Sequence, residues 1–167
     1  MKILTNDPSI TAWGWAVVLL AGERNRVIDT GCIKTKPDYK KKRIRKSDDT
    51  ARRLNEISTE LCRVHQKHEL DWVLSEAPHG SQSSTAATMI GAVMGIISCF
   101  GCCHELPVEW FSEGDAKKHL SGKRSLTKTK TVELIVDIYG DDWFRDVKYK
   151  DEAVADALAV FNVAKET

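Results

Sequence analysis

The first 34 residues constrain the fold more than any other segment, because they hold three β-forming runs separated only by short turns. We predict strands over residues 4–7, 11–20 and 26–34. The segments Asp7-Pro8-Ser9 and Ala21-Gly22-Glu23 are typical of the turns between them. Strands that follow one another so closely favour an antiparallel meander.

The rest of the chain alternates helical and extended patterns. Asp48 and Asp49 predict the start of a helix that runs to about Lys67, since apolar side chains recur there at three- and four-residue steps. Further strands are expected over residues 71–76 and 107–111, and further helices over 85–103, 128–139 and 151–165. This order predicts an α/β fold, a mixed five-stranded sheet flanked by helices, as a single domain over residues 1–167.

The composition is that of a soluble globular protein, with 42% hydrophobic and 29% charged residues. Threonine, serine and glycine interrupt the longest apolar stretch, residues 86–103, so no membrane span is expected. Asp7 lies where a signal peptide needs its apolar stretch. Five scattered cysteines, an odd number, favour reduced thiols. We therefore expect a cytoplasmic protein.

The net charge is only +1, but the basic residues are concentrated in two stretches. Ten lysines and arginines lie between residues 34 and 53 against three acids, and six lie between residues 115 and 130 against Asp115 alone. Either stretch fits a solvated surface loop as well as a track for a polyanion. The candidates for nucleic-acid contact are Lys40, Lys41, Lys42, Arg43, Arg45, Lys46, Lys117, Lys118, Lys123, Arg124 and Lys130.

Carboxylates stand at the ends of two predicted strands and inside the last predicted helix. Asp7 ends the first strand, Glu76 ends the fourth, and Asp156 lies in the apolar run Ala-Asp-Ala-Leu-Ala. Carboxylates gathered in one place repel one another, and divalent metal ions relieve that repulsion. Two such ions can activate a water and stabilise the leaving oxygen of a phosphodiester. Asp151 and Glu152, at the start of the same helix, are further candidates.

Each acid also has an ordinary structural explanation. Asp7 before Pro8 fits a turn, and Asp151 or Glu152 fits a helix cap. Glu76 and Asp156 are harder to explain so, because an unpaired carboxylate in an apolar environment is costly.

Five segments, in the right order, resemble the RuvC family of Holliday junction resolvases within the RNase H-like superfamily. They are Asp7-Pro8-Ser9-Ile10-Thr11-Ala12-Trp13-Gly14-Trp15, Gly31-Cys32-Ile33-Lys34-Thr35, Glu76 with Gly91 and Gly95, the segment from Glu105-Leu106-Pro107-Val108 through Lys117 and Gly122 to Lys128, and Ala155-Asp156-Ala157-Leu158-Ala159. The wording after Glu76 is closest to phage-type relatives, which would place the enzyme in a host cytoplasm.

The resemblance implies a homodimeric endonuclease that resolves four-way DNA junctions by paired symmetric nicks. It implies two Mg²⁺ or Mn²⁺ ions per active site, with Asp7, Glu76 and Asp156 as metal ligands and catalytic residues. Lys128, with Lys130 close behind, is similar to the family's lysine that contacts the scissile phosphate. His79, Ser81 and Gln82 follow the second carboxylate, where the family contacts DNA.

The chain departs from the family pattern at two sites. The family has an acid or histidine three residues before the last aspartate, but Ala153 stands there, so Glu152 is the favoured substitute as catalytic metal ligand and Asp151 the second. His79 stands where the family often has an aromatic residue that opens the junction.

Alternatives remain open. The chain could cut other branched DNA or structured RNA, or it could be a junction-binding module whose active site has decayed. A stripe of small residues, Ala87, Gly91 and Gly95, fits close packing on the chain's own sheet as well as a dimer interface.

Overall fold

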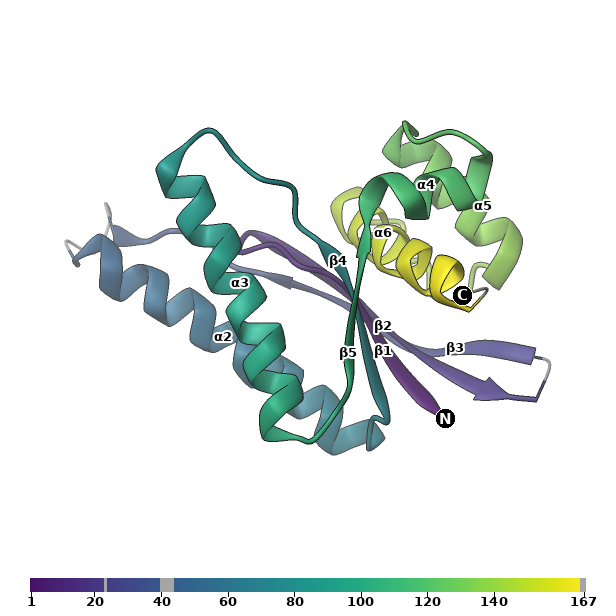
Figure 1. Cartoon of the computed structure of the whole chain (residues 1–167), viewed down its shortest axis with the longest axis horizontal. Helices are drawn as coiled ribbons and strands as arrows, with labels where there is room; N and C mark the ends of the chain where they lie inside the picture. The colour runs from purple at the N-terminus through teal and green to yellow at the C-terminus, as the bar shows by residue number, and fades with distance from the viewer. Residues whose placement is uncertain (23, 40–43, 166–167) are drawn as a thin grey trace.

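The computed structural model describes residues 1–22, 24–39 and 44–165, which build a five-stranded sheet with helices on both faces (Figure 1). Strands β1 (Lys2–Asp7), β2 (Ala12–Ala21) and β3 (Arg24–Lys34) form the expected antiparallel meander. Strands β4 (Trp72–Ala77) and β5 (Val108–Ser112) add parallel to β1, giving the order β3-β2-β1-β4-β5. The prediction of a mixed five-stranded sheet is confirmed.

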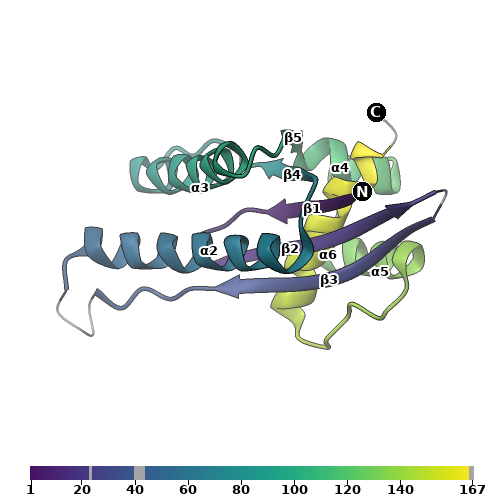
Figure 2. The same ribbon diagram turned by 90° about the horizontal axis from the view of Figure 1, so that it is seen from below.

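Helices α2 (Lys46–His68) and α3 (Ser84–Cys103) cover one face of the sheet, and α4 (Glu113–Ser121), α5 (Lys128–Tyr139) and α6 (Lys148–Ala164) cover the other (Figures 1 and 2). Alternation along the strands divides the core in two. Leu4, Trp13 and Val17 pack toward α2 and α3, whereas Ile3 and Val18 pack toward α6.

Helix α6 lies directly on the sheet, and all of its residues from 153 to 162 are buried. A Cβ atom added to Gly14 of β2 would come within 2.0 Å of the Ala153 carbonyl oxygen. The glycine therefore permits a close approach of the two backbones. This contact fixes the position of α6, and with it the position of Asp156.

Helix α4 is absent from the sequence prediction. It is short and polar, with Ala116 its one buried residue, so its apolar pattern is too weak to signal a helix. Its ends nevertheless follow the usual chemistry, because the Ser112 side chain accepts a hydrogen bond from the Asp115 amide and Gly122 ends the helix with positive φ.

Helix α3 is apolar but only partly covered. By length and composition, it is the one helix among the described residues that could cross a membrane, although we expected no such span. Three of its own residues, Val93, Ile97 and Phe100, are buried. Even so, only 22% of the most apolar 18-residue segment of the helix is buried. An added Cβ at Gly91 or Gly95 would meet nothing within 4 Å. The small-residue stripe therefore faces away from the chain's own sheet.

Candidate active site

The carboxyl ends of β1 and β4 lie side by side and position the first two acids. The parallel register pairs Asn6 with Ser75, so Asp7 and Glu76 follow at the same edge. Asn6 points into the α2–α3 side of the core, where it accepts a hydrogen bond from the Trp13 indole at 3.0 Å and donates to the Leu74 carbonyl at 3.2 Å. Alternation along β1 then directs Asp7 toward α6.

Asp156 reaches the same place from α6. Burial and, after it, the charge of Asp156 raise the pKa of Asp7 to about 7. Burial likewise raises the pKa of Glu76 to about 8, with contributions from the charges of Asp7 and Asp156. These mutual effects show that the structure brings the three predicted acids together. Within the described residues, neither the Asp7 nor the Glu76 carboxylate has a hydrogen bond or an ion pair.

Lys128 supplies a positive charge to this cluster from the first residue of α5. Its Nζ lies 3.1 Å from Oδ2 of Asp156. Burial acts to lower the pKa of Lys128, but the charge and hydrogen bond of Asp156 together with the charges of Asp7 and Glu152 outweigh burial, so the pKa is raised and the lysine stays protonated. Burial raises the pKa of Asp156, and Lys128 opposes that rise.

Glu113, a fourth acid, is the residue that sequence reasoning missed. It directly follows β5, which runs parallel to β4 with Glu76 opposite Phe111. The Glu113 carboxylate binds the Lys117 ammonium, and its Oε2 lies 2.9 Å from Nε2 of His79. The hydrogen bond from Lys117 is the largest cause of its lowered pKa. A signal existed, because strands parallel to β4 end at the same edge, but without α4 in the prediction Glu113 had no assigned position.

Asp151 and Glu152 lie one turn before Asp156 and have different surroundings. The Asp151 carboxylate is buried and accepts the backbone amides of Arg145 at 2.9 Å and Val147 at 2.7 Å, so both of its oxygens anchor the loop before α6. Both acids line a cavity of about 450 Å³ beside α5. The charge of Glu152 contributes to the raised pKa of Lys128. Their predicted roles as metal ligands stay predictions.

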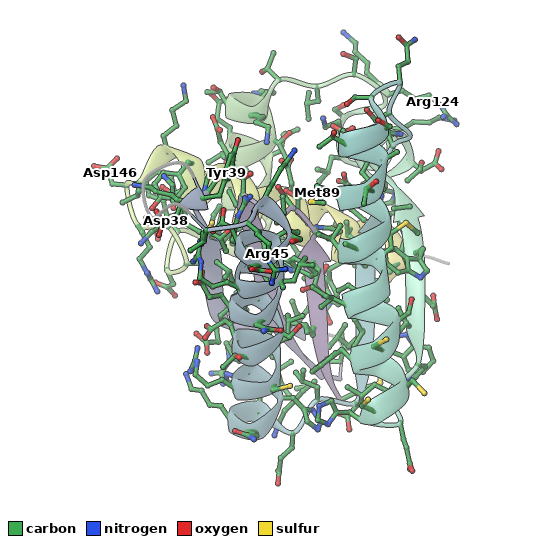
Figure 3. The ribbon with its side chains drawn as sticks, turned by 90° about the vertical axis from the view of Figure 1, so that its left-hand side faces the viewer. Asp38, Tyr39, Arg45, Met89, Arg124 and Asp146 are labelled. Atoms are coloured by element: carbon green, nitrogen blue, oxygen red, sulfur yellow. The ribbon has the colours of Figure 1, made fainter. Side chains whose placement is uncertain are left out.

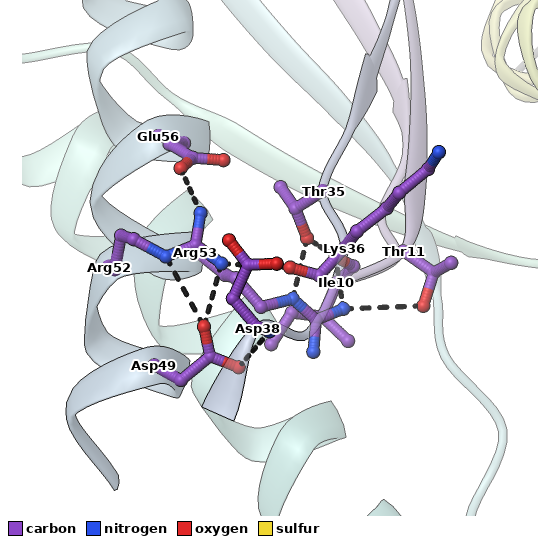
Figure 4. A network of polar contacts seen from close by, with 9 residues as sticks. All are labelled: Ile10, Thr11, Thr35, Lys36, Asp38, Asp49, Arg52, Arg53 and Glu56. Atoms are coloured by element: carbon purple, nitrogen blue, oxygen red, sulfur yellow. Dashed lines mark hydrogen bonds and ion pairs between the residues drawn. The ribbon is translucent and has the colours of Figure 1, made fainter. Parts of the chain in front are cut away.

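The first basic stretch is only partly visible, because Lys40, Lys41, Lys42 and Arg43 lie outside the described residues. Arg45 is 2.8 Å from Asp48 with its side chain exposed, and Lys46 is exposed at the start of α2. At the base of this stretch, Arg53 donates to the Thr35 hydroxyl and the Ile10 carbonyl, and buried Asp49 binds Arg52 (Figure 4). The base is therefore fastened to the end of β3.

The second basic stretch runs from α4 into the start of α5, and most of its basic side chains are exposed to solvent. Lys118, Lys123, Arg124 and Lys130 are exposed, and Arg124 extends outward from the edge of the molecule (Figure 3). Arg124 pairs with Asp115 at 3.0 Å and Lys130 with Glu133 at 2.8 Å. Across the end of β4, Gln82 is exposed and the Ser81 hydroxyl accepts the Ser83 amide. These residues keep their predicted role in DNA contact.

The described residues contain no group of three or more histidine, cysteine, aspartate or glutamate side chains already arranged to hold a metal ion. The donor set nevertheless fits a hard dication, since Asp7, Glu76, Asp156 and Glu113 offer oxygen ligands only. Among the described residues, Asp7 and Glu76 have no hydrogen-bond or ion-pair partner, while burial and then the charges of neighbouring acids raise their pKa values. A dication would relieve that repulsion.

Comparison with known proteins gave one consistent family. The family model described as "Crossover junction endodeoxyribonuclease RuvC" matches residues 3–162. A curated protein of that name from Caldicellulosiruptor saccharolyticus is 28% identical over 161 residues, covering 96% of this chain and 89% of the relative. Another from Nitratidesulfovibrio vulgaris is 25% identical over 169 residues, covering 100% of this chain and 94% of the relative.

Solved structures share the fold. Thermus thermophilus RuvC in complex with a Holliday junction substrate superposes with a TM-score of 0.77 at 20% identity, covering 99% of this chain and 96% of that one. The Fowlpox virus resolvase bound to Holliday junction DNA gives a TM-score of 0.58 at 12% identity, covering 100% of both chains.

Proposed function

This chain belongs to the RuvC family of crossover junction endodeoxyribonucleases, and from that membership we propose that it resolves four-way DNA junctions by paired symmetric nicks. We take residues 1–167 as a single nuclease domain acting in the cytoplasm. The observation that carries the proposal is the pair of carboxylates, Asp7 and Glu76, that have no partner among the described residues and lie beside Asp156 and Lys128. Such a cluster is costly to a fold unless it binds a cation.

The family depends on divalent metal ions, and we propose Mg²⁺ or Mn²⁺, two per active site, held by Asp7, Glu76 and Asp156. Bound there, the metal supplies an activated water and stabilises the leaving oxygen. The residues' own contribution begins with protons: Asp7 and Glu76 have pKa values of about 7 and 8, so metal binding near neutral pH displaces protons from them.

Lys128 is proposed to bind the phosphate in addition to pairing with Asp156. Its ammonium is paired to Asp156 in the absence of DNA and stays protonated, because its pKa is raised. When a phosphodiester enters, the same ammonium can bind a nonbridging oxygen and offset the negative charge that develops there. No nucleophilic side chain is required.

The basic residues are proposed to hold the junction arms. The exposed side chains after α4 and those around the start of α2 carry positive charge on two separate elements. They would bind phosphates without reading sequence, so affinity should fall steeply as salt rises.

We further propose that the functional form is a homodimer that pairs through α3. Two symmetric nicks need two active sites, which a twofold dimer supplies. The exposed stripe of Ala87, Gly91 and Gly95 allows two backbones to approach closely. Beside it, α2 and α3 form an apolar groove of about 460 Å³ lined by Leu54, Ile96 and Phe100. An apolar surface of this kind on a DNA-acting protein favours burial against a second copy.

The test is cleavage of a mobile four-way junction, a fork, a flap, a plain duplex and a structured RNA, each with Mg²⁺ and with chelator. The proposal expects metal-dependent nicks at symmetric positions in opposing strands of the junction. Preferential cutting of the fork, flap or RNA would favour the alternative substrates. Tight junction binding without any cutting would favour a decayed binding module.

A further inference from the structure

Glu113 is placed at the catalytic edge by the sheet itself. In the parallel pairing of β4 and β5, Glu76 lies opposite Phe111 and Ala77 opposite Ser112. Phe111 packs into the core on the α6 side, the side from which Asp156 comes. Glu113 follows one residue after β5 ends, as the first residue of α4. A carboxylate thus follows the end of a third strand, β5, which neighbours the strand of Glu76, and it lies at the same edge of the sheet as Asp7.

The contacts of Glu113 bring two cationic groups from different elements to that edge. Lys117, one turn later in α4, binds one oxygen, and His79 from the segment after β4 contacts the other at 2.9 Å. The carboxylate is about one third exposed, whereas the Lys117 side chain is 12% exposed. The partly open carboxylate can exchange its partners without unfolding α4.

The negative charge of Glu113 acts on all three other acids. It contributes to the raised pKa of Asp7, of Glu76 and of Asp156, after burial and the nearer charges. On α6, Ala153 is pressed against Gly14 in the turn before Asp156, so that position offers no carboxylate. Glu152 stays a candidate on α6, and Glu113 is a candidate from a different element.

We propose that Glu113 is a further metal ligand of this nuclease site, held at the same edge of the sheet as Glu76 and Asp7 by His79 and Lys117 until a divalent cation binds. The proposal rests on the proposed function, since it assumes that the three acids bind metal. When a cation binds, Glu113 turns at least one oxygen from its cationic partner to the ion.

Calorimetric titration of Mn²⁺ into the full chain without DNA tests the assignment independently of cleavage. Glu113→Gln removes the charge and keeps the shape, and we expect its dissociation constant for Mn²⁺ to rise about tenfold, the loss of one charged ligand. Glu109→Gln, an exposed acid on β5, is the matched control and should stay within about twofold of the wild type.

Salt separates ligation from a distant charge effect. The loss in Glu113→Gln should persist at high salt, where exposed charges are screened. A loss that vanishes at high salt, or an affinity equal to that of the wild type, overturns the proposal. Unfolding midpoints measured without metal show whether each variant is folded. If Glu113→Gln is not folded, Glu113→Asp replaces it in the titration, since it keeps the charge but shortens the side chain.

Asp7→Asn distinguishes a failure of the Glu113 assignment from a failure of the metal site in the proposed function. If Asp7→Asn abolishes Mn²⁺ binding while Glu113→Gln does not weaken it, only the role of Glu113 fails. If Asp7→Asn binds Mn²⁺ like the wild type, the metal site of the proposed function fails as well.

Discussion

The two faces of the sheet differ in what they bury and what they expose. On the α6 face, charge is withdrawn from water: Asp156 is 8% exposed, and Asp7 and Glu76 have no partner among the described residues. On the α3 face, apolar surface is left in water, with Gly91 and Gly95 open to solvent. Both features cost folding free energy, so we infer that each face is completed by something outside the chain. On the α6 face this is a divalent cation and DNA, and on the α3 face it is a second copy of the chain.

Replacing one acid on the α6 face should have the largest effect. Asp7→Asn removes a ligand charge, and we expect junction cleavage to fall by roughly 10³-fold or more while junction binding is retained. Cleavage rates and gel-shift affinities on the same junction check this. Full activity in the variant would contradict the assignment of the site.

A charge placed on the α3 face should break the dimer without harming the fold. Gly95→Glu puts a carboxylate where an added Cβ meets nothing, and glutamate is a better helix former than glycine. We expect the dissociation constant of the dimer to increase about 100-fold, because the charge would be buried in the interface. Analytical ultracentrifugation measures it, with Ala21→Glu, at the exposed end of β2, as control. An unchanged dimer would move the interface off α3.

Lys128 sharpens the comparison within the α6 face. We expect Lys128→Ala to lower turnover about 10- to 100-fold and to change junction affinity by less than about threefold, since the ammonium acts on charge that develops in the reaction. Single-turnover rates with saturating enzyme check the first number. An unchanged rate would leave Lys128 as only the structural partner of Asp156.

The pH dependence of stability should be the smallest of these effects. A carboxyl group whose folded pKa is raised destabilises the fold as pH rises from its ordinary value toward the raised one. For Asp7 that window runs from 3.8 to about 7. Without metal, the unfolding midpoint should therefore fall between about pH 5 and about pH 7, and it should fall less in Asp7→Asn. His65, whose pKa burial lowers, acts in the opposite direction, so the difference between the two proteins isolates Asp7. Equal slopes would contradict the buried charge.

The sequence indicated most of the fold and the three acids, because strand ends and an aspartate within an apolar helix are visible locally. For Glu113 it held only a partial signal, the end of a strand expected beside β4, because the position of Glu113 also depends on the register between β4 and β5 and on the short helix α4. It could not separate the roles open to Asp151, since its two amide partners belong to a loop without a pattern of its own. Whether Gly91 faces the sheet or solvent depends on how α3 is rotated, which its nearly uniform apolar character hides.

The central claim is that Asp7, Glu76 and Asp156 form one site completed by divalent metal. Anomalous diffraction from crystals of the chain soaked in Mn²⁺ tests it most directly. We expect one or two manganese peaks that together lie within ligand distance of all three carboxylates, at about 2.0 to 2.3 Å from their oxygens. A peak elsewhere in the molecule with none at these three side chains would contradict it.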